Sequence, residues 1–418
     1  VNLFYTKLNN ESPNSIEQFI SDESGIENKT GYQILNSSSD RNHIRFKTDY
    51  TLPISKKLDL EAGYQNDTKS SNSHYSYSTQ TLNNLITDTS LIDKMDFQRI
   101  VNSFYGILGA DVIGVSIKAG LKIEFVNRSL KEEKSQIKYE LSEINLFPSL
   151  HIAKELKNEQ QVIFSYSRRV NRPNEWMLIP AVSSTGRNML QLGNPELLPD
   201  FTNSFELSYS KRNDIIILSS QLYTRYTKNV ISSSVTERSG IFYQSYENLD
   251  RELSSGVELI TNINIKTWWR MNVSANAYYY SLDGKLASGY SIDNNSFMWN
   301  GSFRTTFIVK GSTYLEFLAI YYGPSILPQG KSKDFYYFDF FVKRNFFNRN
   351  LTVALRSHNT FDTGIYIEDS KGTNYNVHTW FKYEGPTFMA TITYRLNNFK
   401  RHRSSNQPDM NFDSGLDQ

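Results

Sequence analysis

The stretch WRMNVSANAYYY, residues 269–280, decides the fold class, because apolar and polar side chains alternate along its whole length. One face of an extended chain would carry the apolar residues Trp269, Met271, Val273, Ala275, Ala277 and Tyr279. The other face would carry Arg270, Asn272, Ser274, Asn276, Tyr278 and Tyr280. TFMATITYRL, residues 387–396, repeats the pattern. A period of two predicts strands with one apolar and one polar side. Many such strands with aromatic residues at their ends are typical of a transmembrane antiparallel β-barrel of the outer-membrane type.

The same reading along the chain predicts about sixteen strands in an all-β fold. They cover residues 1–8, 43–52, 58–78, 94–111, 116–133, 142–156, 160–172, 203–213, 215–233, 241–264, 268–283, 295–310, 312–325, 333–346, 350–362 and 375–397. Short and long connections alternate between them. The long ones cover 9–42, 79–93, 134–141, 173–202, 234–240, 284–294, 326–332 and 363–374, and a turn of helix is expected within Pro13–Ser24.

Outer-membrane barrels have short periplasmic turns and long extracellular loops. The alternation therefore predicts that the short connections are periplasmic and that the chain is localised in the bacterial outer membrane. Residues 1–397 would form the barrel, and residues 398–418 a polar periplasmic tail. Arg270, Arg304 and Glu316 fall on the predicted lumen side. The aromatic runs 278–280 and 335–338 are interpreted as parts of the membrane-interface girdle rather than as ligand-stacking surfaces.

Composition excludes several other classes. No run reaches the roughly 18–20 apolar residues of a membrane-spanning helix. Cysteine is absent and the net charge is only +2, which argues against disulfides, thiol chemistry and nucleic-acid binding. The six histidines form no HExxH motif and no G-x-S-x-G elbow is present, so we expect no enzyme, no cofactor and no metal site. An aromatic-rich β-sandwich is the less favoured fold.

Several segments resemble a known family. FSYSRRVNRP (residues 164–173), GNPELLPD (193–200) and TNSFELSY (202–209) are the main ones, with LFPSL (146–150) and the closing GPTF and TYRL (385–396) in support. Together they are similar, over roughly residues 143–400, to the outer-membrane β-barrel family of Bacteroidota, a branch of the TonB-dependent receptors. The resemblance implies a barrel of about 22 strands around an N-terminal plug. This sequence has fewer strands, no plug-like segment and no signal peptide, so we expect the C-terminal part of a larger receptor barrel.

The resemblance also implies a function and partners. It implies binding and import of a scarce nutrient, such as an iron chelate, a peptide or a glycan, without any catalytic step. Its partners would be outer-membrane lipid and the TonB complex acting through a plug domain absent from this chain, with a surface lipoprotein over the loops as a further candidate. No nucleic-acid partner is expected.

The family motifs predict where the shaped loop lies. Arg168, Arg169 and Arg172 would stand at the extracellular rim and pair with Glu196, Asp200 or Glu206, which would staple the long loop to the wall. Arginine forks also bind anions, so contact with a ligand is the alternative. Pro173, Gly193, Asn194, Pro195 and Pro199 are interpreted as residues that shape this loop. No residue is assigned to ligand binding.

Two other functions stay open. The first is a passive porin of about 16 strands, which an inward-folded loop at 9–42 or 173–202 would support. The second is a non-transport surface or assembly barrel, which stable co-purification with a large partner would support. A plug encoded upstream would favour the receptor, and a signal peptide immediately before Val1 would favour the porin.

Overall fold

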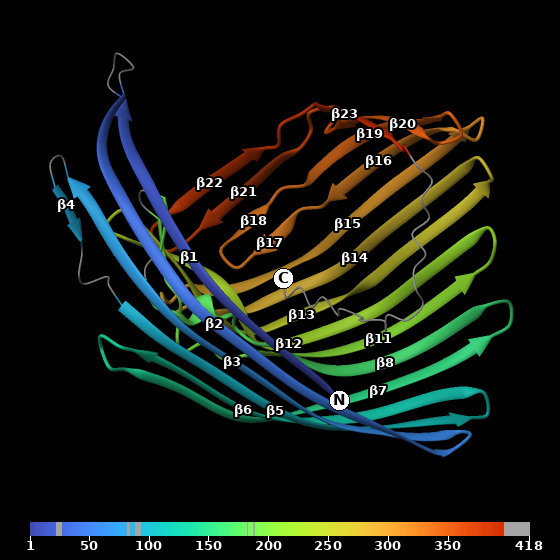
Figure 1. Ribbon diagram of the computed structural model, residues 1–418, viewed down its shortest axis with the longest axis horizontal. Coiled ribbons are helices and arrows are strands. Elements are labelled where there is room, and N and C mark those ends of the chain that lie inside the picture. Colours follow the sequence, from blue (N-terminus) through green and yellow to red (C-terminus); the bar gives the residue numbers. More distant parts are fainter. Residues whose placement is uncertain (22–26, 82–83, 88–92, 182, 187–188, 397–418) are drawn as a thin grey trace.

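A computed structural model describes residues 1–21, 27–81, 84–87, 93–181, 183–186 and 189–396. Its main feature is one curved antiparallel sheet (Figure 1). Sixteen strands of this sheet form a meander in which each strand pairs with the next. They are β1 (Asn2–Ser21), β2 (Glu27–Ser55), β3 (Leu58–Thr81), β5 (Asp93–Val112), β6 (Val115–Glu132), β7 (Lys138–Leu156), β8 (Gln160–Asn171), β11 (Asp200–Arg212), β12 (Ile216–Arg238), β13 (Ile241–Lys266), β14 (Trp269–Lys285), β15 (Ser291–Val309), β16 (Thr313–Tyr322), β19 (Phe335–Phe346), β20 (Leu351–His358) and β23 (Thr387–Tyr394).

The remaining elements belong to the long connections. β4 (Asn84–Thr87) pairs with β3, and β9 (Ser183–Gly186) pairs with β10 (Met189–Gln191). A four-stranded loop sheet is formed by β17 (Ser325–Leu327), β18 (Gly330–Ser332), β21 (Ile365–Lys371) and β22 (Asn376–Lys382). The helix α1 is Glu175–Leu178. Among the described residues, no helix has the length and apolar character needed to cross a membrane.

The predicted alternation of short and long connections is confirmed except between β12 and β13. The long connection predicted at 234–240 is wrong, because β12 runs to Arg238 and a two-residue turn of Ser239 and Gly240, with φ of 54° and 80°, joins it to β13. Short turns join the strands at one end of the sheet, which we call the turn end. Ile113 and Gly114, with φ of 52° and 74°, form one of these turns, as do Lys310 and Gly311 with 49° and 67°. Positive φ at two central residues matches the twist of a two-residue hairpin. The long connections lie at the other end, the loop end. Which end faces the cell exterior remains a prediction.

Two other predicted boundaries are wrong. Residues 9–21 and 27–42 are not loop, because β1 and β2 remain paired from Asn2 and Lys47 to Ser21 and Glu27. The part of Pro13–Ser24 that is described lies in β1, so the expected turn of helix is absent there. This segment has little hydrophobic periodicity, but the backbone ladder does not require it. Pro13 is tolerated since β1 pairs on one side only.

The predicted strand 375–397 is divided. β22 belongs to the loop sheet, where it pairs with β21, and β23 begins only at Thr387 in the main sheet. Gly385 and Pro386 lie between them. Pro386 has no backbone donor for a continuous ladder, so the chain changes sheets here. The predicted tail at 398–418 lies outside the described residues.

The two faces of the sheet differ in chemistry. Cross-strand partners share a face, so the pairing of Leu207 with Leu222 places both on one face, where they are 46% and 56% exposed. This apolar face is the outer face. The opposite, inner face carries the ion pair between Arg304 Nε and Glu316 Oε1 at 3.5 Å. Arg270 pairs with Thr306, whose hydroxyl donates to Glu316, so all three predicted charges lie on the polar face.

The aromatic runs are split between these faces. Trp299 stacks on Tyr321 at a ring distance of 4.2 Å, and Tyr321 on Tyr336 at 6.2 Å, which forms an outer aromatic belt that fits the girdle interpretation. Tyr280 instead donates to Glu252 on the inner face at 3.1 Å. Tyr278, Phe335 and Tyr337 also face inward. The girdle interpretation is therefore wrong for these four residues, because alternation turns every second aromatic away from lipid.

Candidate functional site

The connection between β8 and β11, described at residues 172–181, 183–186 and 189–199, folds onto the inner face of the sheet; we call it the inner loop. Its apolar residues Leu178, Ile179 and Leu197 are buried at 0–4% exposure. They form one cluster with Met95, Phe97 and Leu130, which come from the inner face of β5 and β6. Burying side chains of this size contributes about 1.5–3 kcal/mol each, so the inner loop is packed into the wall.

Polar contacts also attach the inner loop to the wall, on the side that carries its buried apolar residues. The guanidinium of Arg128, on β6, donates to the carbonyls of Leu197 at 2.7 Å and Pro195 at 3.1 Å. On α1, Glu175 accepts a hydrogen bond of 2.5 Å from the Ser71 hydroxyl. The Nε atom of Arg41 lies 3.6 Å from the same carboxylate. Strands β2, β3 and β6 are therefore all tied to one loop.

The opposite side of the inner loop is tied to β13. The side chain of Asn248 accepts from Leu198 N and donates to Leu198 O, both at 2.9 Å. Asn194 donates to the carbonyl of Tyr246 at 2.9 Å. β10 adds a short parallel ladder, in which Met189 pairs with Phe242. The inner loop thus bridges distant strands across the inside of the sheet.

The family-motif residues have other partners than the predicted ones. Arg172 forms an ion pair with the buried Glu124 of β6, which Lys122 Nζ also contacts at 2.8 Å. Arg168 lies over the ring of Phe201 at 5.0 Å, and Arg169 donates to the Ser167 hydroxyl at 3.2 Å.

Two of the three predicted carboxylates, Asp200 and Glu206, also pair elsewhere, whereas Glu196 contributes its backbone N–H to the side-chain oxygen of Asn194 at 3.0 Å. Asp200 accepts from Asn171 at 2.9 Å. Glu206 accepts from Ser204 and lies 3.7 Å from Arg225. The stapling of the inner loop is performed by Arg128 and Asn248, which no motif singled out and which only their long-range contacts reveal.

The loop-shaping residues lie where the backbone is most crowded. Gly193 donates to the carbonyl of Ile179 at 2.9 Å, and a Cβ atom at Gly193 would lie 2.3 Å from that oxygen. Only glycine fits such a close backbone approach. Pro195 presents its carbonyl to Arg128, and Pro173 and Pro199 lie together beside Arg128 and Arg172.

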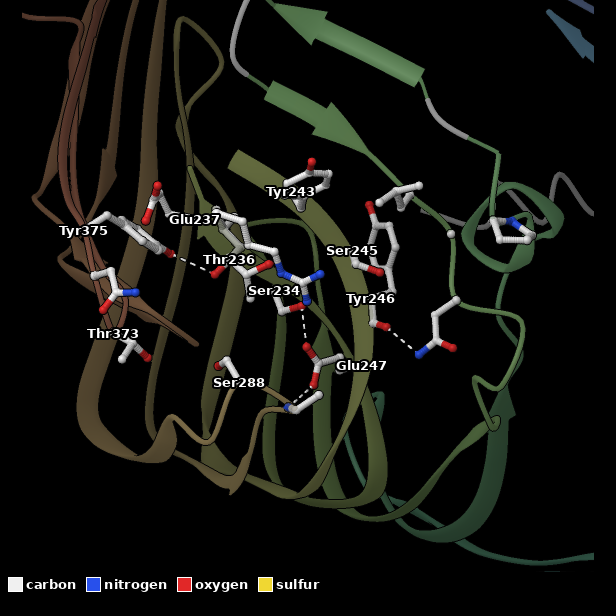
Figure 2. A pocket seen from close by; sticks show the side chains of 18 of the residues that line it. Ser234, Thr236, Glu237, Tyr243, Ser245, Tyr246, Glu247, Ser288, Thr373 and Tyr375 are labelled. Atoms are coloured by element: carbon white, nitrogen blue, oxygen red, sulfur yellow. Dashed lines mark hydrogen bonds between the residues drawn. The ribbon is translucent and has the colours of Figure 1, made fainter. Parts of the chain in front are cut away.

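A cleft of about 680 Å³ opens between the inner loop and the loop ends of β12 and β13 (Figure 2). We call it the central cleft. Its lining is mixed. Polar side chains come from Ser234, Thr236, Glu237, Arg238, Tyr243, Ser245, Tyr246, Glu247, Ser288, Thr373 and Tyr375, apolar ones from Leu192, Val235 and Ala287, and the inner loop adds Gly193, Asn194 and Pro195. Three motif residues therefore contribute to the wall of the central cleft.

Hydrogen bonds order the walls of the central cleft. The carboxylate of Glu247 accepts from the Ser234 hydroxyl at 2.7 Å and from Ala287 N at 2.5 Å, so it fixes the turn between β14 and β15 (Figure 2). The hydroxyl of Tyr375 donates to the carbonyl of Val235 at 3.2 Å, which ties the loop sheet to β12 (Figure 2). The walls are thus organised without a ligand.

Free polar groups remain in the central cleft. One oxygen of Glu237 accepts from Gly240 N at 2.6 Å, and the guanidinium of Arg238 lies 5.8 Å from the ring centre of Tyr243. Hydroxyl groups of Thr236, Ser245 and Ser288 complete the lining. Within the described part of the chain, no group of three His, Cys, Asp or Glu residues could hold a metal ion. The arrangement is suited to reversible binding of a polar ligand.

Comparisons with known proteins agree with this geometry. The model of the outer membrane protein beta-barrel family matches residues 1–394. No curated protein sequence matches the chain. Similar solved structures include the copper transporter OprC (TM-score 0.65, 13% identity, 94% of this chain and 62% of that chain) and the siderophore receptor PiuA from Acinetobacter baumannii (0.63, 12%, 94% and 62%). A third is the ferric citrate transporter FecA in the unliganded form (0.62, 11%, 93% and 58%).

At these identities the structures show the fold, and the chain spans 58–62% of their length. The family match and these transporter and receptor folds agree with the prediction of an outer-membrane barrel that is not an enzyme. The origin in Bacteroidota stays a prediction. With a family match over residues 1–394, a sixteen-strand antiparallel meander and an apolar outer face, the chain belongs to the outer membrane protein beta-barrel family.

Proposed function

We propose that this chain forms the wall of a TonB-dependent-receptor-like transporter that binds a scarce nutrient at its loop end and imports it. The observation that carries the proposal is the central cleft, which lies on the inner face at the loop end and is lined by polar groups from separate loops. Similar solved structures are a copper transporter, a ferric citrate transporter and a siderophore receptor. For this chain the cargo class is an iron chelate, a peptide or a glycan.

The orientation and partners are part of the same proposal. The loop end faces the exterior, and the turn end and the residues 398–418 face the periplasm. Residues 1–397 line the barrel in contact with outer-membrane lipid. Energy comes from the TonB complex through a plug outside this chain, and a surface lipoprotein covers the loops. The motif residues Gly193, Asn194 and Pro195 shape the inner loop.

A passive porin is the second candidate, because the inner loop folds inward as that alternative requires. Against it, β1 pairs only with β2 and β23 only with β20 in the described part of the chain. Unpaired strand edges are unfavourable in lipid, because each backbone group without a hydrogen bond there costs roughly several kcal/mol of free energy. We therefore propose that further strands complete the sheet.

Conductance distinguishes the two candidates. The protein purified from native outer membranes is reconstituted in a planar lipid bilayer with KCl, and its insertion is checked by resistance to protease. The receptor proposal predicts no steady ion current and binding of the purified periplasmic domain of TonB. A steady current in the absence of any ligand, with no TonB binding, would establish the porin instead.

A further inference from the structure

A second cavity lies on the inner face, apart from the central cleft. It has a volume of about 310 Å³ and is lined by Tyr322, Phe335, Tyr337, His358, Asn359, Gly364 and Tyr383. We call it the aromatic pocket. Its four aromatic rings come from β16, β19 and the segment before β23. None of its residues lines the central cleft.

The strand register places the aromatic pocket on the polar inner face of the main sheet. Tyr322 pairs with Phe335 across β16 and β19, and with Asn300 of β15. Asn300 in turn pairs with Asn276, which accepts a hydrogen bond from the buried Tyr223 on the inner face. The rings of Tyr322, Phe335 and Tyr337 are therefore turned away from lipid, although Tyr322 is 52% exposed. Exposed rings on a polar face need a reason other than membrane anchoring.

The rings form a continuous wall. The ring centre of Phe335 lies 5.4 Å from that of Tyr383, 5.9 Å from that of Tyr337 and 6.2 Å from that of Tyr322. These rings are tilted against one another by 31–57°, so they present faces toward a shared space rather than stacking on each other. Such a wall suits a ring-shaped ligand with apolar faces.

One polar side chain of the pocket is held in a fixed orientation. Nδ1 of His358 lies 2.8 Å from Oδ1 of the buried Asp339, and an ionised carboxylate can only accept, so Nδ1 carries the proton. Asp339 also accepts from Arg356 at 2.5 Å and from Asn359 N at 3.0 Å. Nε2 of His358 then points away from Asp339, where it is available for a hydrogen bond with a ligand. Tyrosine hydroxyls supply further donors and acceptors.

Buried hydrogen bonds also fix the floor of the pocket. Asn359, 1% exposed, accepts from Thr363 N at 3.0 Å and Gly364 N at 3.1 Å through its side-chain oxygen. Its side-chain nitrogen donates to the carbonyl of Tyr383 at 3.2 Å. The loop that carries Tyr383 is therefore positioned before any ligand arrives. A preorganised pocket loses less entropy on binding.

Charge decides the class of ligand. The carboxylate of Asp339 is already ion-paired with Arg356 and hydrogen-bonded to His358, so the pocket offers no free anion to a cationic ligand. Arg356 is equally occupied by Asp339, so no free cation awaits an anionic chelate. Ring faces with a few fixed hydroxyl and imidazole groups fit a neutral, polyhydroxylated ring. We infer that the aromatic pocket binds a single pyranose ring of a neutral saccharide, as a site separate from the central cleft.

Saturation-transfer NMR with maltose tests this inference. The protein is purified from native outer membranes in lauryldimethylamine oxide, a detergent without a sugar headgroup. We expect transfer to the ring protons of maltose, and an affinity about fivefold or more lower in Tyr383→Ala and in Tyr322→Ala. The matched control is Tyr336→Ala, whose ring lies on the outer face one position from Tyr337. It should leave binding unchanged.

The outcomes separate this site from the proposed function. No transfer to maltose, or equal transfer to wild type and to both pocket variants, would overturn the inference. Displacement of maltose by benzoate would overturn the assignment of a saccharide. A loss of binding in Tyr243→Ala alone would place the sugar in the central cleft, against this inference but in favour of the proposed transporter. Heat-modifiable migration on gels verifies that each variant is folded.

Discussion

The variant Arg128→Met should release the inner loop from the wall. The guanidinium of Arg128 donates to two carbonyls of the inner loop, at Leu197 and Pro195. Hydrogen bonds from a charged donor contribute about 1.5–3 kcal/mol each. Methionine avoids the desolvation cost of a buried guanidinium. Its introduction, however, leaves the two carbonyls without a hydrogen-bond donor. We expect the free energy of opening the inner loop to fall by about 2–3 kcal/mol.

Hydrogen exchange measures this loss where it occurs. The amides of Gly193 and Asn194 donate within the inner loop to the carbonyls of Ile179 and Met177, so their exchange reports opening. A loss of 2–3 kcal/mol corresponds to exchange faster by about 30- to 150-fold. The barrel ladder should keep its protection, because each strand pairs independently of the loop.

The matched control is Arg344→Met. Arg344 is an exposed arginine on β19 that lies over the ring of Phe346 and touches no part of the inner loop. Its replacement should leave exchange at Gly193 and Asn194 unchanged. Unaltered exchange in Arg128→Met would refute the reasoning, since it would mean that the apolar cluster alone holds the inner loop. Equal acceleration throughout the sheet would also refute it.

Three further variants test the loop end. Gly193→Ala should displace the inner loop, because the new Cβ would lie 2.3 Å from the Ile179 carbonyl; protease cleavage within 172–199 should appear, and an intact loop would contradict the close approach. Leu178→Ala should lower the stability of the loop by about 2–5 kcal/mol, measured by the same exchange; a loss below about 1 kcal/mol would show that Leu178 is not fully packed. Glu247→Gln should loosen the turn at Ala287, seen as faster exchange of that amide with the rest of β14 unchanged; equal rates would show that the carboxylate charge is not needed.

Alternation along each strand made most of the main sheet predictable. A period of two is a local property, and it located all sixteen strands of the meander as well as the ends at which they turn. The failures occurred where no local pattern exists. Residues 9–42 are rich in serine and asparagine, and the extended pairing of residues 9–21 and 27–42 follows from the partner strand. The division before Thr387 depends on where β22 finds a partner.

The site was less predictable for the same reason. Arg172 finds Glu124 in an earlier strand, and Arg128 reaches an inner loop almost 70 positions later. Sequence spacing gives no indication of such long-range pairs. The partners predicted for the arginines, Glu196, Asp200 and Glu206, were therefore acidic residues close to them in the sequence. The inward direction of Tyr337 was predictable, because side chains alternate between the two faces of a strand and Tyr336 beside it faces outward.

Lipid and water accessibility along β12 tests the assignment of the two faces most directly. The chain contains no cysteine, so single cysteines at Leu222 and Gln221 can carry spin labels without background. The account predicts that the label at 222 collides with oxygen dissolved in lipid and the label at 221 with a water-soluble nickel chelate. Equal accessibility at both positions, or the reverse order, would contradict a membrane barrel whose polar face encloses the inner loop.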